Sequence, residues 1–105
     1  MKLAHNVFFT LRDNSSAKVQ ALIDACKKYL TVQPGIVHFA CGKLEPELAR
    51  EVNDRGFDVG LHIIFTDRAA HDAYQDETTH LRFIAENKAN WKQVRVFDTL
   101  VESLR

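Results

Sequence analysis

The sequence has few cysteines, prolines and glycines, and neither sign of charge is in excess. Its 105 residues include two cysteines, two prolines and four glycines, and 14 basic side chains balance 14 acidic ones. Two cysteines outside any C-x-x-C pair cannot form a disulfide scaffold, so we expect Cys26 and Cys41 to be reduced, buried thiols of a cytoplasmic protein. A net charge of zero also disfavours a nucleic-acid partner, because general nucleic-acid binders carry a surplus of Lys and Arg.

Long apolar runs and the common catalytic motifs are also missing. No stretch approaches the roughly 18 uncharged apolar residues of a membrane span, so no membrane partner is expected. His5 and Asn6 interrupt the apolar residues near the amino terminus, which favours a strand over a signal peptide. The absence of G-x-G-x-x-G, P-loop, G-x-S-x-G and H-E-x-x-H motifs disfavours nucleotide-binding domains and the corresponding hydrolases.

The chain does have enough apolar residues for a single domain over residues 1–105. Hydrophobic residues make up 46% of the sequence and charged residues 27%, which is typical of a folded globular domain. At this length, surface scaling predicts that about 65% of the unfolded surface is buried on folding. This composition excludes a disordered tail, a repeat protein and a multidomain enzyme.

Hydrophobic periodicity predicts strands and helices in a definite order. Alternating apolar residues predict four strands, over residues 3–11, 36–44, 57–65 and 94–100. Spacings of three and four predict helices over about 19–30, from a cap at Thr66 or Asp67 to about Gln75, and over about 79–90. The polar stretch 45–56 is expected to be an exposed connection, with one helical turn around residues 46–50 as an option.

Two elements carry more detailed expectations. One face of the third strand is expected to consist of its odd-numbered residues, which are Phe57, Val59, Leu61, Ile63 and Phe65. The apolar residues of the last helix are expected to be Leu81, Ile84 and Ala85. The whole order predicts an α+β fold of the ferredoxin-like βαββαβ type, a four-stranded antiparallel sheet with the first and third strands in its middle.

Helices can cover only one face of such a sheet, and the opposite face is not polar. It carries Phe8 and Ile64 and, depending on register, Val37, Phe39 or Phe97. Leaving large apolar side chains exposed forfeits about 1.5–3 kcal/mol each, and contiguous exposed apolar patches usually mark an interface. We therefore expect a homodimer through the sheet faces. A monomer with a scattered apolar surface is the alternative.

Three side chains are candidates for acid–base chemistry. His5 begins the first strand on the face of Val7 and Phe9, where it either acts as a base or bonds a backbone carbonyl. Tyr74 and His80 flank the junction between the two C-terminal helices. A phenol and an imidazole placed there can bind a carbonyl or enolate oxygen and move a proton, or they only bond each other and the backbone.

The remaining histidines favour structural interpretations. We expect His38 and His62 to be neighbours on the second and third strands, facing the presumed dimer interface. His71 and Asp72 are expected on the exposed side of the short helix, where a metal site is a minor alternative. We therefore expect no metal and no cofactor.

Several segments occur in the same order in one known family. They are residues 5–9, the Pro34-Gly35-Ile36 turn, and residues 57–67, 73–75, 80–83 and 94–98. Together they resemble the stress-responsive A/B barrel domain (Dabb) family over essentially the whole chain. The resemblance implies a dimeric α+β barrel, in which two ferredoxin-like subunits pack their sheets together with the helices outside.

The same resemblance bears on activity. Most members of the family have no assigned activity, but a plant branch includes polyketide cyclases, which close a poly-β-keto chain by an aldol step without a cofactor. Those enzymes are similar at the positions of Tyr74, His80 and His5. A further pocket histidine of that branch falls where this sequence has Val59, and residues 45–55 have no clear counterpart there.

Three functions follow as hypotheses. The first is a homodimer that binds a small apolar or aromatic ligand between sheet and helices, with His5, Tyr74 and His80 as polar groups. The walls of that pocket are expected to be Val7, Phe9, Val59, Leu61 and Ile63. The second is a cofactor-independent cyclase-like, isomerase-like or monooxygenase-like enzyme, in which His80 is the base, Tyr74 stabilises the oxygen and His5 orients. The third is a purely structural module, and a cavity of about 300 Å³ or more would favour either of the others over it.

Overall fold

Four strands form one antiparallel sheet in the order β2-β3-β1-β4. The computed structural model describes residues 1–102. Its strands are β1 (Lys2–Leu11), β2 (Ile36–Lys43), β3 (Val59–Phe65) and β4 (Trp91–Val101). β1 and β3 lie in the middle of the sheet and pair in antiparallel register, with Val7 opposite Leu61. The predicted α+β, ferredoxin-like βαββαβ fold with a four-stranded antiparallel sheet is confirmed.

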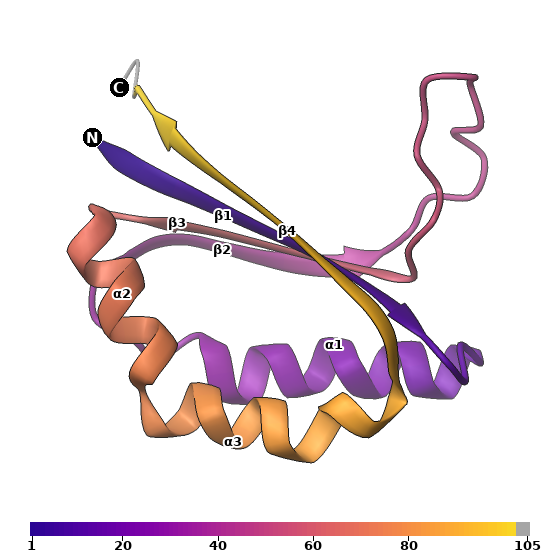
Figure 1. Cartoon of the computed structure of the whole chain (residues 1–105). Coiled ribbons are helices and arrows are strands. Elements are labelled where there is room, and N and C mark those ends of the chain that lie inside the picture. Colours follow the sequence, from indigo (N-terminus) through magenta and orange to yellow (C-terminus); the bar gives the residue numbers. More distant parts are fainter. Residues whose placement is uncertain (103–105) are drawn as a thin grey trace.

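All helices lie on one side of this sheet (Figure 1). They are α1 (Ser16–Leu30), α2 (Arg68–Asp76), α3 (Thr78–Asn87) and the short 3-10 helix η1 (Lys88–Asn90). Side-chain caps begin two of them: the Ser15 hydroxyl accepts from the Lys18 N–H at 3.4 Å, and the Asp67 carboxylate accepts from the Ala70 N–H at 2.8 Å. Glu77 has an extended backbone and separates α2 from α3.

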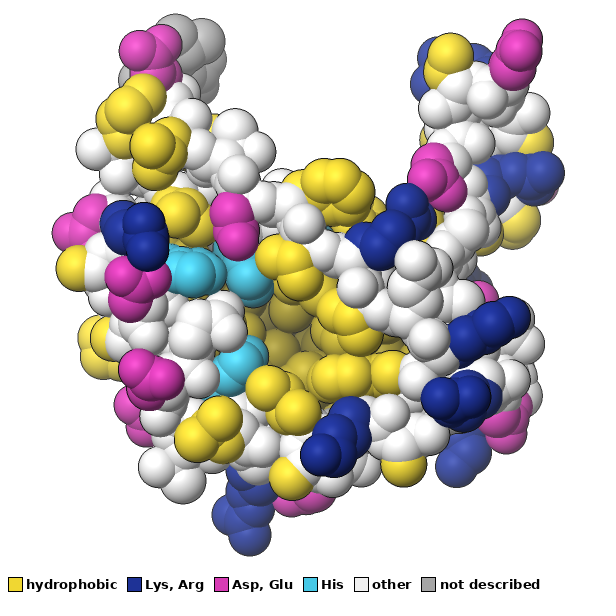
Figure 2. All heavy atoms as spheres, in the orientation of Figure 1, with side chains coloured by type: hydrophobic (Ala, Val, Ile, Leu, Met, Phe, Trp, Pro, Cys, Tyr) yellow, Lys and Arg dark blue, Asp and Glu magenta, His cyan; other side chains and the backbone are white. Residues whose placement is uncertain are grey.

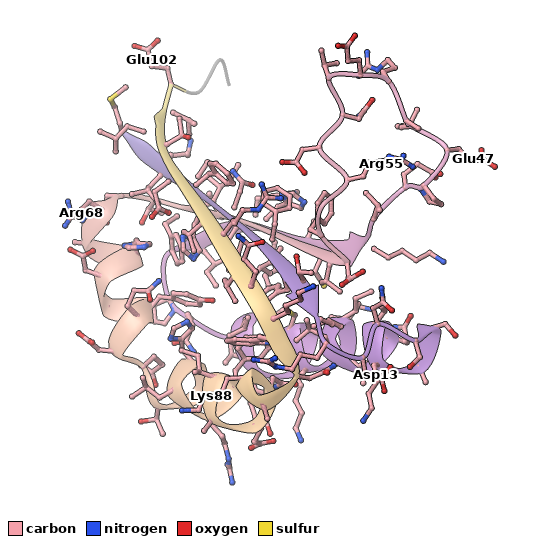
Figure 3. The ribbon with its side chains drawn as sticks, turned by 45° about the vertical axis from the view of Figure 1, so that its right-hand side comes forward. Asp13, Glu47, Arg55, Arg68, Lys88 and Glu102 are labelled. Atoms are coloured by element: carbon pink, nitrogen blue, oxygen red, sulfur yellow. The ribbon has the colours of Figure 1, made fainter. Side chains whose placement is uncertain are left out.

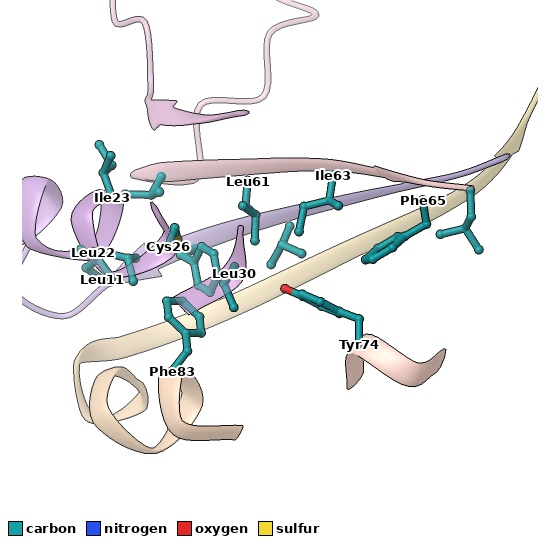
Figure 4. Packing of buried hydrophobic residues seen from close by; sticks show 14 residues of the cluster. Leu11, Leu22, Ile23, Cys26, Leu30, Leu61, Ile63, Phe65, Tyr74 and Phe83 are labelled. Atoms are coloured by element: carbon teal, nitrogen blue, oxygen red, sulfur yellow. The ribbon is translucent and has the colours of Figure 1, made fainter. Parts of the chain in front are cut away.

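The core is the single layer between the sheet and the helices. Every second residue of β1 from Leu3 to Leu11 is buried, and the odd-numbered residues of β3 are buried as well. Figure 4 shows Leu61, Ile63 and Phe65 pointing from β3 towards the helices. Burial at this level contributes about 1.5–3 kcal/mol for each large apolar side chain.

Gly35 positions the start of β2 against α2. Its φ of 85° lies in the left-handed region that only glycine adopts without strain. A Cβ added there would also lie 2.5 Å from the Ala70 Cβ. Glycine at this position therefore permits both the turn and the close approach of the two segments.

The structure corrects four details of the sequence analysis. Cys26 is buried as expected, but Cys41 on β2 is only partly buried. Phe57 precedes β3 and packs on Phe8 at 4.9 Å between ring centroids, so it lies on the helix-free face rather than with Val59. Leu81 is 53% exposed, because His80 and Phe83 take the inward positions of α3. Residues 45–56 contain turns but no helix.

Residues 44–58, which we call the arm, leave the sheet between β2 and β3 (Figure 1). The Leu44 N–H donates to the Asp58 carbonyl at 3.2 Å and closes the base of the arm. Arg95 on β4 pairs with Asp54 at 2.8 Å and ties the arm to the helix-free face. Glu47 and Arg55 also lie on the arm (Figure 3), and the Arg55 guanidinium donates to the Pro46 carbonyl at 3.4 Å.

None of the helices within residues 1–102 has the length and hydropathy that crossing a membrane requires.

Candidate functional site

A cavity of about 170 Å³ lies between the sheet and the helices α2 and α3. Its wall is mostly apolar and comes from both the sheet and the helices, including Val7, Phe9, Leu30, Leu61, Phe83, Ile84, Trp91, Val94 and Val96. Four polar side chains also line it, namely His5, Tyr74, Gln75 and His80. Figure 2 shows a hollow of hydrophobic side chains with histidines along one wall.

The three candidate acid–base residues therefore meet at one place. Val7, Phe9 and Leu61 of the expected pocket wall line the cavity as well. Val59 and Ile63 lie on the same face of the sheet but outside the lining, at 0% and 1% exposure in the core. The volume is below the roughly 300 Å³ that was expected to favour a ligand or substrate over a purely structural module. It is close to that of a cavity that holds a single benzene ring.

The break between α2 and α3 places Tyr74 and His80 side by side. Their ring centroids are 4.5 Å apart, at an interplanar angle of 49°. The His80 Nδ1 lies 3.1 Å from the Gln75 carbonyl oxygen. Because a carbonyl only accepts hydrogen bonds, Nδ1 carries the proton and neutral His80 keeps Nε2 as an acceptor. Figure 4 shows the Tyr74 hydroxyl directed into the space under the sheet.

Burial keeps both of these groups uncharged. It lowers the pKa of His80 below 6.5, and the nearby imidazoles of His5 and His71 lower it further, against the effect of the Gln75 carbonyl. Burial, with a smaller contribution from Cys26, raises the pKa of Tyr74 well above its usual range. At neutral pH the pair is thus a neutral base beside a neutral hydrogen-bond donor.

His5 is held by Asp98, a residue that the sequence analysis did not single out. The His5 Nδ1 lies 2.5 Å from an Asp98 oxygen, across the register pair of β1 with β4. Burial lowers the pKa of His5, although the hydrogen bond with Asp98 and its charge act in the opposite direction. The alternation of Asp98 with Val94 and Val96 indicates that the three residues share one face of the strand. The contact of Asp98 with His5 follows only from the pairing of β4 with β1.

His71 lies inward rather than on the exposed side of α2 as expected. Its side chain is 14% exposed, and its ring centroid is 5.0 Å from that of His5 and 5.7 Å from that of Phe65. The Asp72 carboxylate accepts from the His71 Nδ1 at 2.9 Å. His71 is three residues before Tyr74, a spacing that places both on one helix face.

The other two histidines lie on the helix-free face, as expected. The His62 Nδ1 is 2.8 Å from the Asn6 side-chain oxygen, and its ring centroid is 5.8 Å from that of Phe8. Burial lowers the pKa of His62, with a smaller effect from the neighbouring His38. His38 and Ile64 are register partners on this face.

One buried donor at the cavity wall has no partner. Trp91 lines the cavity, and its ring centroid is 4.9 Å from that of Phe9. Within residues 1–102, the Trp91 Nε1 is buried without a hydrogen bond.

Solved structures share this fold. A Dabb family protein with a ferredoxin-like fold from Mesorhizobium loti is 22% identical, with a TM-score of 0.78 over 97% of this chain and 98% of the other. A dimeric ferredoxin-like protein of unknown function from Thermobifida fusca is 20% identical, with a TM-score of 0.80 over 96% and 92%. A hydroxynitrile lyase from Passiflora edulis is 18% identical, with a TM-score of 0.76 over 99% and 96%.

The comparison with curated proteins finds no match. The model of the stress responsive A/B barrel domain, by contrast, matches residues 3–101. This match covers nearly the whole chain and confirms the resemblance stated from the sequence. The chain belongs to the stress responsive A/B barrel domain family.

Proposed function

We propose that this protein is a homodimeric domain that binds a small one-ring ligand in the cavity between sheet and helices. The observation that carries the proposal is the apolar space of about 170 Å³ on which His5, Tyr74 and His80 converge. Apolar walls with a few convergent polar groups are the usual construction of small-molecule sites. The two free cysteines, Cys26 and Cys41, support a cytoplasmic location.

The polar groups indicate the chemistry of the ligand. Tyr74 is a donor and the free nitrogen of His80 is an acceptor, so the ligand carries both an acceptor oxygen and a hydroxyl or acidic C–H group. Neither group is charged at neutral pH, and the surrounding wall is apolar, so the ligand is uncharged. Phenols and small β-diketones combine these properties.

The dimer part of the proposal rests on the helix-free face. Phe8, Phe57 and Phe97 form a cluster there, with the centroids of Phe57 and Phe97 lying 4.9 and 5.8 Å from that of Phe8. Phe97 is 51% exposed, and a second copy would cover it. The arm lies at one end of this face and the end of β4 lies at the other (Figure 1). The partner's sheet would pack between them. The Thermobifida fusca relative is described as dimeric.

A second function, proton transfer, is favoured by the neutral pair of Tyr74 and His80. In this reaction His80 Nε2 takes a proton from the carbon next to a carbonyl group. The C–H electron pair forms the enolate, whose oxygen accepts a hydrogen bond from Tyr74. His5, oriented by Asp98 at 2.5 Å, helps to place the substrate. The enolate then takes a proton back or attacks a second carbonyl, and neither step needs a redox cofactor.

Binding is tested by NMR, with the His80 ring resonances followed during titration with phenol and with acetylacetone. We expect saturable shifts of His80, weakened in Tyr74→Phe, which removes only the hydroxyl. Leu81→Ala, an exposed change on the same helix, is the matched control and retains the shifts. Unchanged His80 resonances with both compounds would contradict the binding proposal.

Catalysis is tested separately by the exchange of α-protons of cyclohexanone in D₂O. A positioned general base contributes about 10²- to 10⁴-fold to the rate, so His80→Gln should remove that acceleration. Ligand binding in the same variant is measured in parallel. If His80→Gln binds the ligand and exchanges protons as fast as the unmodified protein, the enzymatic proposal fails while the binding proposal stands.

A further inference from the structure

We propose that His5, His71 and Asp98 form a binding site for one divalent transition-metal ion at the rim of the cavity. Each residue offers one ligand atom, and these atoms all lie within 4.8 Å of one another. Two imidazoles and one carboxylate suit borderline ions such as Zn²⁺, Co²⁺ or Fe²⁺ rather than Mg²⁺ or Ca²⁺, which prefer oxygen ligands. The metal ion and the proposed organic ligand are separate ligands, although His5 belongs to both sites.

The fold places the three residues from three different elements. His5 on β1 and Asp98 on β4 are direct register partners, so their side chains leave the same face of the sheet. His71 comes from α2, whose first turn is fixed by the Asp67 cap. The centroids of the His5 and His71 rings are 5.0 Å apart. Backbone hydrogen bonds of sheet and helix thus position the site.

The surroundings of His71 favour a metal ligand over a surface histidine. Its Nδ1 donates to the Asp72 carboxylate at 2.9 Å, which leaves Nε2 unprotonated. A carboxylate behind the histidine is the usual support of a metal-bound imidazole, because it fixes the tautomer and the ring orientation. Asp72 is itself held by Arg68 at 2.9 Å. The Gln75 amide nitrogen lies 3.4 Å from the His71 Nε2, so an ion bound there would replace this weak hydrogen bond.

The distances require only small movements. Ligand atoms about 2.0–2.2 Å from one ion lie roughly 3–4 Å apart, so His5 Nδ1 and the Asp98 oxygen, now at 2.5 Å, must separate, and any pair near the 4.8 Å limit must come closer. The hydrogen bond between His5 and Asp98 places one proton within the cluster, and binding an ion through these two atoms releases it.

The site is closed on one side and open on the other. The His5 side chain is 6% exposed and that of Asp98 is 41% exposed, so an ion can enter past Asp98. Three protein ligands leave at least one coordination position for water or for an oxygen of a small ligand, as in catalytic rather than structural metal sites. Tyr74 lies beside this position, with its ring centroid 6.0 Å from that of His5.

The test is a titration of the full-length protein with Co²⁺, whose visible absorption reports both binding and coordination number. We expect a saturable spectrum at one equivalent. Asp98→Asn and His71→Ala should abolish it, and Asp72→Asn should weaken binding about 10- to 100-fold, as the loss of a supporting carboxylate does. Circular dichroism of each variant verifies that it is folded.

His38→Ala is the matched control, because it removes an exposed histidine from the opposite face of the sheet. It should leave the spectrum and the stoichiometry unchanged. The proposal is overturned if the unmodified protein shows no saturable spectrum, or if the folded Asp98→Asn and His71→Ala variants retain it. The organic-ligand experiments are run with EDTA, so their outcome is independent of this one.

Discussion

The two faces of the sheet are built from the same strands, yet the subunit buries the apolar side chains of one face far more completely than those of the other. On the helix-covered face, the odd-numbered residues of β3 are almost fully buried. On the helix-free face, the aromatic cluster of Phe8, Phe57 and Phe97 remains partly open, with only the arm beside it. The difference shows that the position of the helices, rather than hydrophobicity, determines which apolar residues are buried.

The edge strand β4 has apolar side chains exposed on both of its faces. Val96 points to the helix-covered face and Phe97 to the helix-free face, yet they are 50% and 51% exposed. The helices lie under the rest of the sheet and leave the edge strand uncovered, so Val94 and Val96 border the opening of the cavity. One face of β4 thus lines the candidate site, and the other is part of the surface on which we propose that a second subunit packs.

The largest effect is expected on the helix-covered face. Phe65→Ala deletes a ring that is 0% exposed, and it should lower the free energy of unfolding by about 3–5 kcal/mol. Urea unfolding followed by circular dichroism measures the change. Phe97→Ala removes the same atoms from the other face and is the control. In dilute solution, where subunits are separate, its effect should stay near 0.5 kcal/mol, and equal effects at the two positions would contradict the comparison.

The second effect is on assembly. Phe97→Lys places a charge in the aromatic cluster of the helix-free face, and it should weaken the proposed dimer by about 30-fold or more, since central aromatic residues contribute about 2 kcal/mol or more to interfaces. Light scattering over a range of concentrations gives the dissociation constant. Leu81→Lys makes a similar change on the exposed side of α3 and should leave assembly intact. A Phe97→Lys protein that stays dimeric would refute sheet-to-sheet packing.

The third effect is the pH dependence of the helix-covered face. Burial lowers the pKa of His5 and His80 below 6.5 in the folded protein. As the pH falls, the unfolded chain takes up these protons before the folded chain does. The free energy of unfolding therefore has its full value above pH 6.5 and decreases below it. Urea unfolding at a series of pH values measures the slope.

His80→Gln should reduce this slope, because it removes one of the three histidines, with His5 and His62, whose pKa burial lowers. Leu81→Gln introduces the same side chain at an exposed, non-titrating position of the same helix and should leave the slope as it is. A slope that His80→Gln does not change would contradict the contribution of the lowered His80 pKa.

Local patterns predicted the fold, whereas the site depended on contacts between distant segments. The alternation in β1 placed His5 inward correctly, because a period of two is a property of the strand itself. Asp98 became visible only through the register of β4 with β1. His71 was misplaced because the packing of α2 on the sheet sets its rotation, and Phe57 because the strand begins two residues later. Tyr74 and His80 were found because a helix break is encoded locally.

The smallest expected effect concerns Gly42 and Gly60, two register partners on the helix-free face. Gly42 lies on the helix-free face, and a Cβ built there meets nothing within 4 Å, whereas one at Gly60 meets His62 Nε2 at 3.1 Å and Phe8 Cε1 at 3.4 Å. In the monomeric Phe97→Lys background, Gly42→Ala should therefore stabilise the fold by about 0.4–1 kcal/mol by restricting the unfolded chain, and Gly60→Ala should not. Urea unfolding measures both. Dimerisation is measured separately, with Gly42→Ala in the otherwise unmodified protein. If Gly42→Ala stabilises the monomer and weakens that dimer, the added methyl lies where the partner's sheet packs. If dimerisation is unaffected, the second copy covers only the part of the face near Phe97.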